Sequence, residues 1–442
     1  MKSSSRAGGT SPADESTNVG LMSAAALGVG GMMGAGLYTL LGQAAAASGT
    51  WLPVAFLLGA LVASLSVYSY ARFGAKFPSD GGAAQMLVQG LGRTTWSGGL
   101  NVFQFFAYLA ATALYAAGFG EYVLALGGDA LPSWANQAAG IAVVAMFTLV
   151  NMISTKLVGR AESLIVGVEI AILIALITLG IFKADPSLMS SQSLPGGPVG
   201  IVVAAALLYV TYQGFGVVAN ASGSMRRPGR ELPRAMFLSL AIVTVIYLAI
   251  STLVVMLLPV GVMETDAGHV LANVGQAIAG RAGFVAIAIA ALLATSSAVN
   301  ATLFAASNVG RNVAENRQLS AALTATLWRN GSVALVGSGI TVVILVLVFP
   351  LSAIGQLASL GFLLVYASVS LSHLRVRRET HAKRSVLIAA IVANMVLFTI
   401  LLAHTIRSQT SSAVALAVAL IGSFVFEWLY RRRLARRSSS AS

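Results

Sequence analysis

Two glycine-rich segments, in the first and sixth of a series of apolar runs, are the part of this sequence best suited to chemistry. Residues 28–38 read GVGGMMGAGLY and residues 212–220 read YQGFGVVAN. Glycine at that density weakens an α-helix, and a broken helix leaves backbone N–H and C=O groups without partners. The N-terminus of a half-helix suits a carboxylate, and free carbonyls suit an ammonium group or a cation. The segments therefore predict non-covalent binding of a zwitterion such as an amino acid.

The elements that position these segments are long apolar helices. Of 442 residues, 57% are hydrophobic and 9% are charged, where soluble domains carry about 25% charged residues. Such a composition is typical of a polytopic α-helical membrane protein. The apolar runs lie at 19–47, 51–75, 97–126, 137–155, 161–183, 199–223, 234–260, 281–309, 331–349, 352–373, 386–404 and 411–430. We therefore expect an all-α protein with about twelve transmembrane helices.

The basic residues predict the orientation of these helices. The net charge is +13, and if the N-terminus is inside, all of the 27 Lys and Arg residues except Lys183, Arg281 and Arg407 lie in inner loops or tails. This distribution follows the positive-inside rule, so we expect both termini in the cytoplasm and the protein in the cell membrane. The charge thus records topology, and we expect no nucleic-acid partner. Anionic lipid remains an alternative partner for the basic C-terminal run.

The positions of the two glycine-rich segments predict the domain organisation. A small-residue pair such as Gly30 and Gly34 could serve close helix packing alone. Two broken spans in corresponding places of two five-helix halves instead favour an inverted-repeat transporter that binds its substrate at mid-depth. The predicted parts are a disordered tail (1–18), the first repeat (19–183), the second repeat (199–373), two peripheral spans (386–430) and a basic tail (431–442).

At these residues the sequence resembles the amino acid–polyamine–organocation superfamily of secondary transporters, from the first span to at least the tenth. It is most similar to the archaeal-type, proton-coupled, broad-specificity amino acid transporters. Besides the two glycine-rich segments, the resemblance is carried by residues 68–78 (YSYARFGAKFP) with Gly81 and Gly82, residues 158–162 (VGRAE), Arg227 and Pro228, residues 232–235 (LPRA) and residues 296–301 (SSAVNA).

The resemblance implies a leucine-transporter-like fold, with ten core helices in a 5+5 inverted repeat, two peripheral helices and alternating access. It implies that the substrate carboxylate lies at the first break and the amino group at the sixth. Leu37 and Phe215 offer apolar lining, and Phe215 could instead be a core aromatic. The substrate-binding residues so predicted are Gly34, Ala35, Gly36, Leu37, Tyr212, Gly214, Phe215 and Gly216.

The sequence departs from the resemblance at the coupling site. Proton-coupled relatives place a lysine in the fifth span, and the matching position here is Glu169. Sodium-coupled relatives use a site between the first and eighth spans, matched by Thr295 and Ser296. A charged carboxylate inside the bilayer is costly. Our hypothesis is that Glu169 binds the transported proton near Thr295 and Ser296, with Na⁺ coordination or a structural protonated acid as alternatives.

Other chemistry finds little support in the sequence. There is no cysteine, and the four histidines lie in loops or at span ends without metal-ligand spacing, where we expect them to be exposed and to bind no metal. Glu162 and Glu427, at inner span ends, are expected to be solvated or paired with arginine. We expect no enzyme, no cofactor and no channel. The open alternatives are a polyamine or cationic amine carrier, an exchanger or exporter, and a sensor without flux; the oligomeric state stays open.

Overall fold

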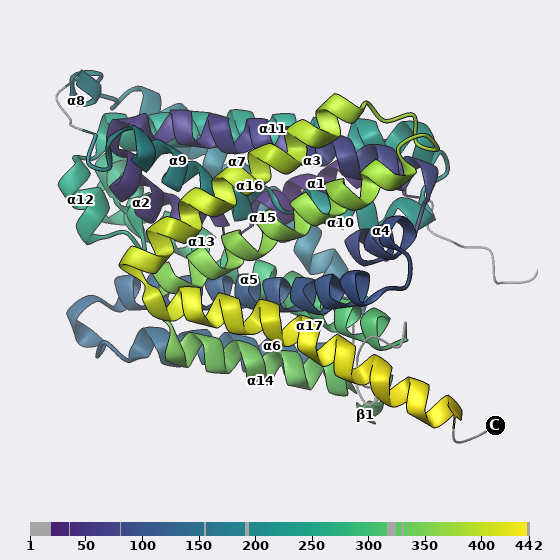
Figure 1. Ribbon diagram of the computed structural model, residues 1–442. Helices are drawn as coiled ribbons and strands as arrows, with labels where there is room; N and C mark the ends of the chain where they lie inside the picture. The colour runs from purple at the N-terminus through teal and green to yellow at the C-terminus, as the bar shows by residue number, and fades with distance from the viewer. Residues whose placement is uncertain are drawn as a thin grey trace, which may run out of the picture.

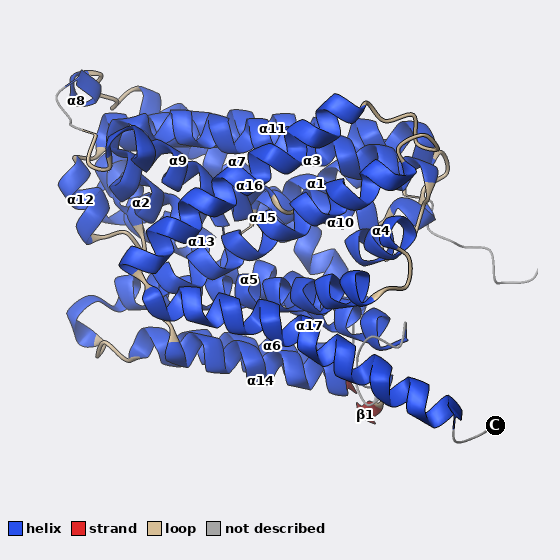
Figure 2. Cartoon of the chain, in the orientation of Figure 1, coloured by secondary structure: helices blue, strands red, loops and turns tan. Residues whose placement is uncertain are grey.

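A computed structural model describes residues 19–34, 36–79, 81–153, 156–190, 194–315, 324–328 and 331–439. These residues are almost all helical (Figure 2). One small antiparallel pair of strands, β1 (Thr326–Trp328) and β2 (Gly331–Ser332), links two of the helices. The α-helices are α1 (Leu21–Met33), α2 (Gly36–Ser48), α3 (Leu52–Lys76), α4 (Gly82–Leu91), α5 (Thr95–Gly127), α6 (Ala135–Ile153), α7 (Lys156–Ile181), α8 (Ser187–Ser190), α9 (Gly197–Leu208), α10 (Phe215–Asn220), α11 (Pro228–Leu257), α12 (Val260–Thr265), α13 (Val270–Glu315), α14 (Val333–Val348), α15 (Leu351–Val376), α16 (Arg384–Ser408) and α17 (Thr410–Ser439).

The helices match the predicted membrane spans. Within the described residues, ten stretches are long and apolar enough to cross a bilayer, and α1 and α14 are shorter apolar helices. The first predicted span contains α1 and α2, the sixth contains α9 and α10, and each remaining run contains one main helix, which is the shorter α14 in the run at 331–349. The prediction of an all-α polytopic membrane protein is confirmed.

The predicted breaks occur in both glycine-rich segments. Helix α1 ends at Met33, and Gly34 leaves the helical region with φ −50° and ψ −164°. In the sixth span, α9 gives way to the 3₁₀-helix η3 (Tyr209–Tyr212), and α10 starts at Phe215. The remaining 3₁₀-helices, η1 (Gly49–Trp51), η2 (Gly128–Ala130) and η4 (Ser222–Ser224), lie at helix ends.

The most buried spans of the bundle are α15, the sixth span with α9 and α10, and α5. Helix α5 packs along both α13 and α15, while α3 packs along α11 on one side and α6 packs with α14 on the other (Figure 1). Spans α5 and α15 are mostly buried, whereas α6, α7 and α17 mostly face outward. Helix α13 is interrupted at Ala279 and Gly280, where Gly280 adopts a φ of 63° that favours glycine.

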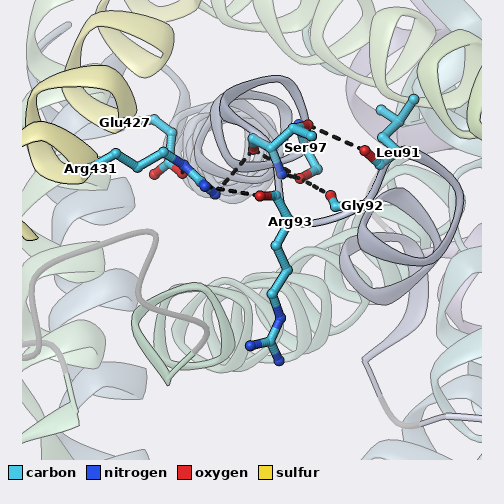
Figure 3. Close-up of polar contacts among 7 residues, drawn as sticks. Leu91, Gly92, Arg93, Ser97, Glu427 and Arg431 are labelled. Carbon is cyan, nitrogen blue, oxygen red and sulfur yellow. Dashed lines mark hydrogen bonds and ion pairs between the residues drawn. The ribbon is translucent and has the colours of Figure 1, made fainter. Parts of the chain in front are cut away.

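The last helix, α17, is fixed to the start of α5 by Arg431 and Glu427, two residues of α17 that also form an ion pair with each other (Figure 3). Arg431 Nε lies 2.6 Å from Oε1 of Glu427, whose side chain is fully buried. The same guanidinium donates to the carbonyls of Arg93, at 2.9 Å, and Thr94, at 3.2 Å. Glu427 also packs on Gly98, where a Cβ atom would overlap its carboxylate. The expected arginine pairing of Glu427 is therefore confirmed, whereas the side chain of Glu162 lies outside the described residues.

Candidate functional site

The two broken spans touch at their breaks. Gly214 lies so close to Gly31 and Met32 that a Cβ atom at Gly214 would overlap their backbone atoms. A Cβ atom at Gly36 would lie 3.0 Å from Cγ2 of Thr211, which is tighter than an ordinary van der Waals contact. The glycines therefore allow the two backbones to cross at close range as well as weakening the helices.

Side chains from α11 and α15 hold the carbonyl groups of these breaks. The hydroxyl of Tyr247 lies 2.5 Å from the carbonyl oxygen of Met32 and 3.4 Å from that of Thr211, so it joins both breaks. On α15, the Ser359 hydroxyl donates to the Leu207 carbonyl at 2.6 Å, and the Tyr366 hydroxyl donates to the Gln213 carbonyl at 3.0 Å. A broken helix inside a membrane needs such partners for its backbone.

The predicted substrate-binding residues lie around this crossing. Gly34 faces α13, where its Cβ would lie 3.3 Å from that of Ala298. Gly36, Leu37, Tyr212, Gly214, Phe215 and Gly216 are all buried, and Ala35 lies outside the described residues. The first and sixth breaks are thus brought together.

Two of these side chains have protein partners already. The Tyr212 hydroxyl donates to the Phe56 carbonyl on α3 at 3.0 Å, and its ring packs on Tyr247. The Phe215 ring packs against Tyr70 and Tyr366, with ring centroids 5.3 Å and 4.8 Å away. In this conformation Phe215 is therefore part of an aromatic cluster, and Tyr212 anchors η3 to α3.

A cavity of about 530 Å³ leads toward the breaks from the side on which α1 begins. Its walls belong to α1, α5, α7, α10 and α13, and near the breaks they include Gly30, Gly31 and Val217. Ser23 on α1 and Asn308 on α13 line it farther out. The residues that line it nearest the break, Gly30 and Gly31, lie about one helical turn before Gly34, so the cavity approaches the predicted site from one side.

The opposite side of the crossing is tightly packed. A Cβ atom at Gly42 on α2 would overlap the backbone of Ala267, which follows α12. A Cβ atom at Gly200 on α9 would overlap the carbonyl of Ala47 at the end of α2. Close backbone contacts of this kind hold α2 against both neighbours. The site is thus approached by a large cavity on one side and faces packed helices on the other.

Glu169 lies at the first break. Its side chain is 3% exposed, and its Oε1 atom has no hydrogen-bond partner in the part of the chain that the structure describes. One turn earlier, Val166 lines the large cavity and packs on Gly30. Helix α7, which carries Glu169, packs against α13 and against α11, the helix of Tyr247. A buried acid thus lies on a helix that contacts the helix of the tyrosine joining the two breaks.

The structure does not join Glu169 to the other two predicted coupling residues by hydrogen bonds. The Thr295 hydroxyl donates to the Ala291 carbonyl at 2.6 Å, and the Ser296 hydroxyl donates to the Leu293 carbonyl at 2.9 Å, both within α13. Thr295 is fully buried and packs near Gly118 of α5. The described residues also contain no cluster of acids and histidines that could hold a metal ion.

The expectation of exposed histidines is wrong for His373. Its side chain is fully buried near the end of α15, with Nδ1 3.0 Å from the Ser69 hydroxyl and Nε2 2.8 Å from the Thr380 hydroxyl. It also packs on the ring of Phe73. The helix continues past the predicted end of the span, so a residue placed at the membrane surface lies inside the bundle.

Sequence reasoning also missed Tyr247 and Gln104. Tyr247 is a single tyrosine in an unbroken apolar helix, and only its position in space reveals that it reaches both breaks. Gln104 could have been noticed as an uncharged polar residue within an apolar span, because a buried amide requires partners. Its Oε1 atom is buried and has no partner among the described residues.

Comparisons with known proteins agree with this architecture. A family model described as "Amino acid permease" matches residues 19–426. The inner membrane transport protein YbaT of Escherichia coli is 32% identical over 415 residues, covering 92% of this chain and 94% of its own. An uncharacterized protein of Methanocaldococcus jannaschii is 30% identical over 420 residues, covering 95% and 97%. The chloroplastic cationic amino acid transporter 6 of Arabidopsis thaliana is 26% identical over 263 residues, covering 54% and 45%.

Proposed function

Because the chain belongs to the amino acid permease family, we propose that this multi-pass membrane transporter carries an amino acid across the cell membrane by alternating access, coupled to protons. The observation that supports the proposal most directly is the crossing of two broken spans at the end of a large one-sided cavity. Unwound backbone at mid-depth is tolerated in a membrane where it contacts protein, water or a polar ligand. No covalent step is needed.

The substrate carboxylate would bind at the first break. Helix α2 starts at Gly36 in the middle of the bundle, so its first N–H groups and its dipole point toward the crossing. The substrate ammonium would bind carbonyl groups of the sixth break near Tyr212 and Gly214. Neither helix end requires a charged side chain, which agrees with the scarcity of charged residues inside the spans.

Glu169 would carry the proton. A carboxylic acid that is almost fully buried is less costly when neutral than when charged. Its unpartnered Oε1 leaves room for a change of hydrogen bonding when the proton leaves. Tyr247 lies within hydrogen-bond distance of the Met32 and Thr211 carbonyls. Through this hydroxyl, a change in the hydrogen bonding of Glu169 would alter the hydrogen bonds of both breaks. Protonation and substrate binding would then influence the same backbone groups.

The conformation corresponds to an inward-facing state if both termini are cytoplasmic, as the distribution of Lys and Arg predicts. The large cavity opens on the side where α1 begins, and the Gly42 and Gly200 contacts close the other side. Alternating access would require these contacts to separate while the cavity closes. Release of substrate to the cytoplasm would then be the step that this conformation represents.

The test is uptake of radiolabelled amino acids into proteoliposomes that contain the purified protein. An inward proton gradient should drive accumulation, and a protonophore should abolish it. Glu169→Gln should lose the response to the gradient while retaining exchange of labelled for unlabelled substrate. Glu121→Gln is the matched control, because that carboxylate lies on another spanning helix and is paired with Asn136 at 2.9 Å.

Three results would contradict parts of the proposal. Accumulation that needs a sodium gradient and ignores the proton gradient would reject proton coupling. An unchanged pH response in Glu169→Gln would remove Glu169 from the coupling step. Binding of amino acids without any flux or exchange would indicate a sensor rather than a carrier.

A further inference from the structure

A second, much smaller cavity lies beside the sixth break. Its volume is about 10 Å³, and it lies between α3, α5, α10 and α15. A cavity of this size holds about one water-sized group. The residues that matter for its chemistry are Tyr70, Gln104, Tyr108, Gly216, Asn220 and Tyr366.

Two polar atoms in its wall lack partners. The Tyr70 hydroxyl and the Gln104 Oε1 atom are buried and make no hydrogen bond within the described residues. Tyr70 is 1% exposed and Gln104 is 3% exposed, so bulk water does not satisfy them. Buried polar groups are nearly always paired in folded proteins. Two unpaired groups around one small cavity therefore indicate that a polar group binds between them.

The small cavity is adjacent to the large one. Gln104, Tyr108 and Asn220 line both. Gly216 leaves the space open, because a Cβ atom there would lie 3.9 Å from the Tyr108 hydroxyl and 4.0 Å from that of Tyr366. A molecule held in the large cavity near Gly31 could thus extend a short side chain between these residues.

The chemistry of the wall favours a neutral hydrogen-bond donor. Among the described residues, the lining contains aromatic rings, a glutamine and an asparagine but no carboxylate or basic group. A buried ammonium group without a counter-charge would be strongly disfavoured. The unpartnered Gln104 Oε1 is an amide oxygen, which can only accept a hydrogen bond. A hydroxyl group fits the volume of the cavity and can donate a hydrogen bond to Gln104 Oε1.

We propose that this cavity, defined by Tyr70, Gln104, Tyr108 and Gly216, is a specificity subsite that binds the hydroxyl of a small neutral amino acid, with Gln104 as its acceptor. The inference rests on the proposed transport function and adds to it the class of amino acid transported, one with a small hydroxyl-bearing side chain. It predicts preference for threonine over valine, which has nearly the same shape but lacks the hydroxyl. Rejection of the apolar analogue follows because it would leave the buried acceptor unpaired.

The experiment compares uptake of radiolabelled threonine, valine and alanine by the full-length protein in proteoliposomes. Wild type should prefer threonine over valine by about fivefold or more, as expected for one neutral hydrogen bond. Gln104→Leu should bring that ratio near one while alanine uptake persists. Gln356→Leu is the matched control, because Gln356 Oε1 is also buried and unpartnered but lines neither cavity.

The outcomes separate the subsite from the function. If wild type transports threonine and valine equally, the subsite is refuted and the transport function stands. If Gln104→Leu and Gln356→Leu change the threonine-to-valine ratio to the same extent, the effect is structural and the subsite is refuted. A cavity that holds only a structural water would give either this result or equal transport of threonine and valine by wild type. Transport of no amino acid by wild type would refute the proposed function itself. Tyr70→Phe, which keeps the ring, should lower the ratio in the same direction if Gln104→Leu fails to fold.

Discussion

Tyr247→Phe tests whether one hydroxyl group holds the two breaks together. The substitution keeps the ring and its contacts with Phe56 and Tyr212. It removes the only donor within hydrogen-bond distance of both the Met32 and the Thr211 carbonyls in the described residues. Leaving a buried acceptor unsatisfied costs about 1–3 kcal/mol. We therefore expect the free energy of unfolding to fall by that amount.

Tyr38→Phe is the matched control for this prediction. Tyr38 is as deeply buried as Tyr247, but its hydroxyl has no hydrogen-bond partner among the described residues. Removing an unpaired hydroxyl loses no hydrogen bond and removes a buried polar group that has no partner. The stability of the Tyr38→Phe variant should therefore equal or exceed that of wild type. Both substitutions remove a buried tyrosine hydroxyl, but only Tyr247→Phe removes a hydrogen bond.

The assay is the thermal midpoint of the purified protein, measured by recovery of monodisperse material after heating in detergent. Since unfolding of membrane proteins is commonly irreversible, the variants must be heated at one rate and compared as a set. Tyr247→Phe should melt several degrees below wild type, and Tyr38→Phe should not. Equal midpoints for the two variants would refute the reasoning that Tyr247 joins the breaks through its hydroxyl.

Two further substitutions test the packing. Gly214→Ala places a methyl group on the Gly31 backbone, so overpacking of about 1–3 kcal/mol should reduce folded yield and uptake. Gly167→Ala is the control and should preserve both, because nothing lies within 4 Å of a Cβ atom at Gly167. Equal yields for the two variants would show that the two breaks can move apart without loss of the fold. Arg431→Ala leaves the buried Glu427 carboxylate without its cation and should lower the thermal midpoint. Adding Glu427→Gln should restore most of the loss, and failure of this rescue would show that the carbonyl contacts of the arginine matter more than the charge.

The sequence predicted the breaks because glycine acts locally. A helix that contains Gly28, Gly30, Gly31, Gly34 and Gly36 loses stability whatever surrounds it, and α1 ends at Met33. The apolar runs were equally informative, since a bilayer requires about twenty apolar residues for each crossing. Features that depend on one segment of chain were thus predictable from that segment.

Partners that come from distant helices were not predictable in this way. Tyr247 and Met32 are 215 positions apart, and Ser359 and Leu207 are 152 positions apart. No periodicity in α11 or α15 distinguishes these residues from others on the same helices. The burial of His373 was missed for the same reason, because its partners Ser69 and Thr380 become visible only when the helices are packed.

These distant partners change how the binding site must work. Free carbonyls at a broken helix appear ready to bind an ammonium group, but here Tyr247, Ser359 and Tyr366 already donate to carbonyls at Met32, Leu207 and Gln213. Because a carbonyl oxygen can accept two hydrogen bonds, the substrate ammonium group could share one of these carbonyls with the hydroxyl or replace it, and a displaced hydroxyl would need another acceptor. Under the proposed function, Glu169 with its unpaired Oε1 would offer the hydroxyl another acceptor even when protonated, because the carbonyl oxygen of a neutral carboxyl accepts hydrogen bonds. Transfer of the Tyr247 hydroxyl from the Thr211 carbonyl at the sixth break to a protonated Glu169 would therefore let the proton and the substrate ammonium bind together, without a charged side chain at the substrate.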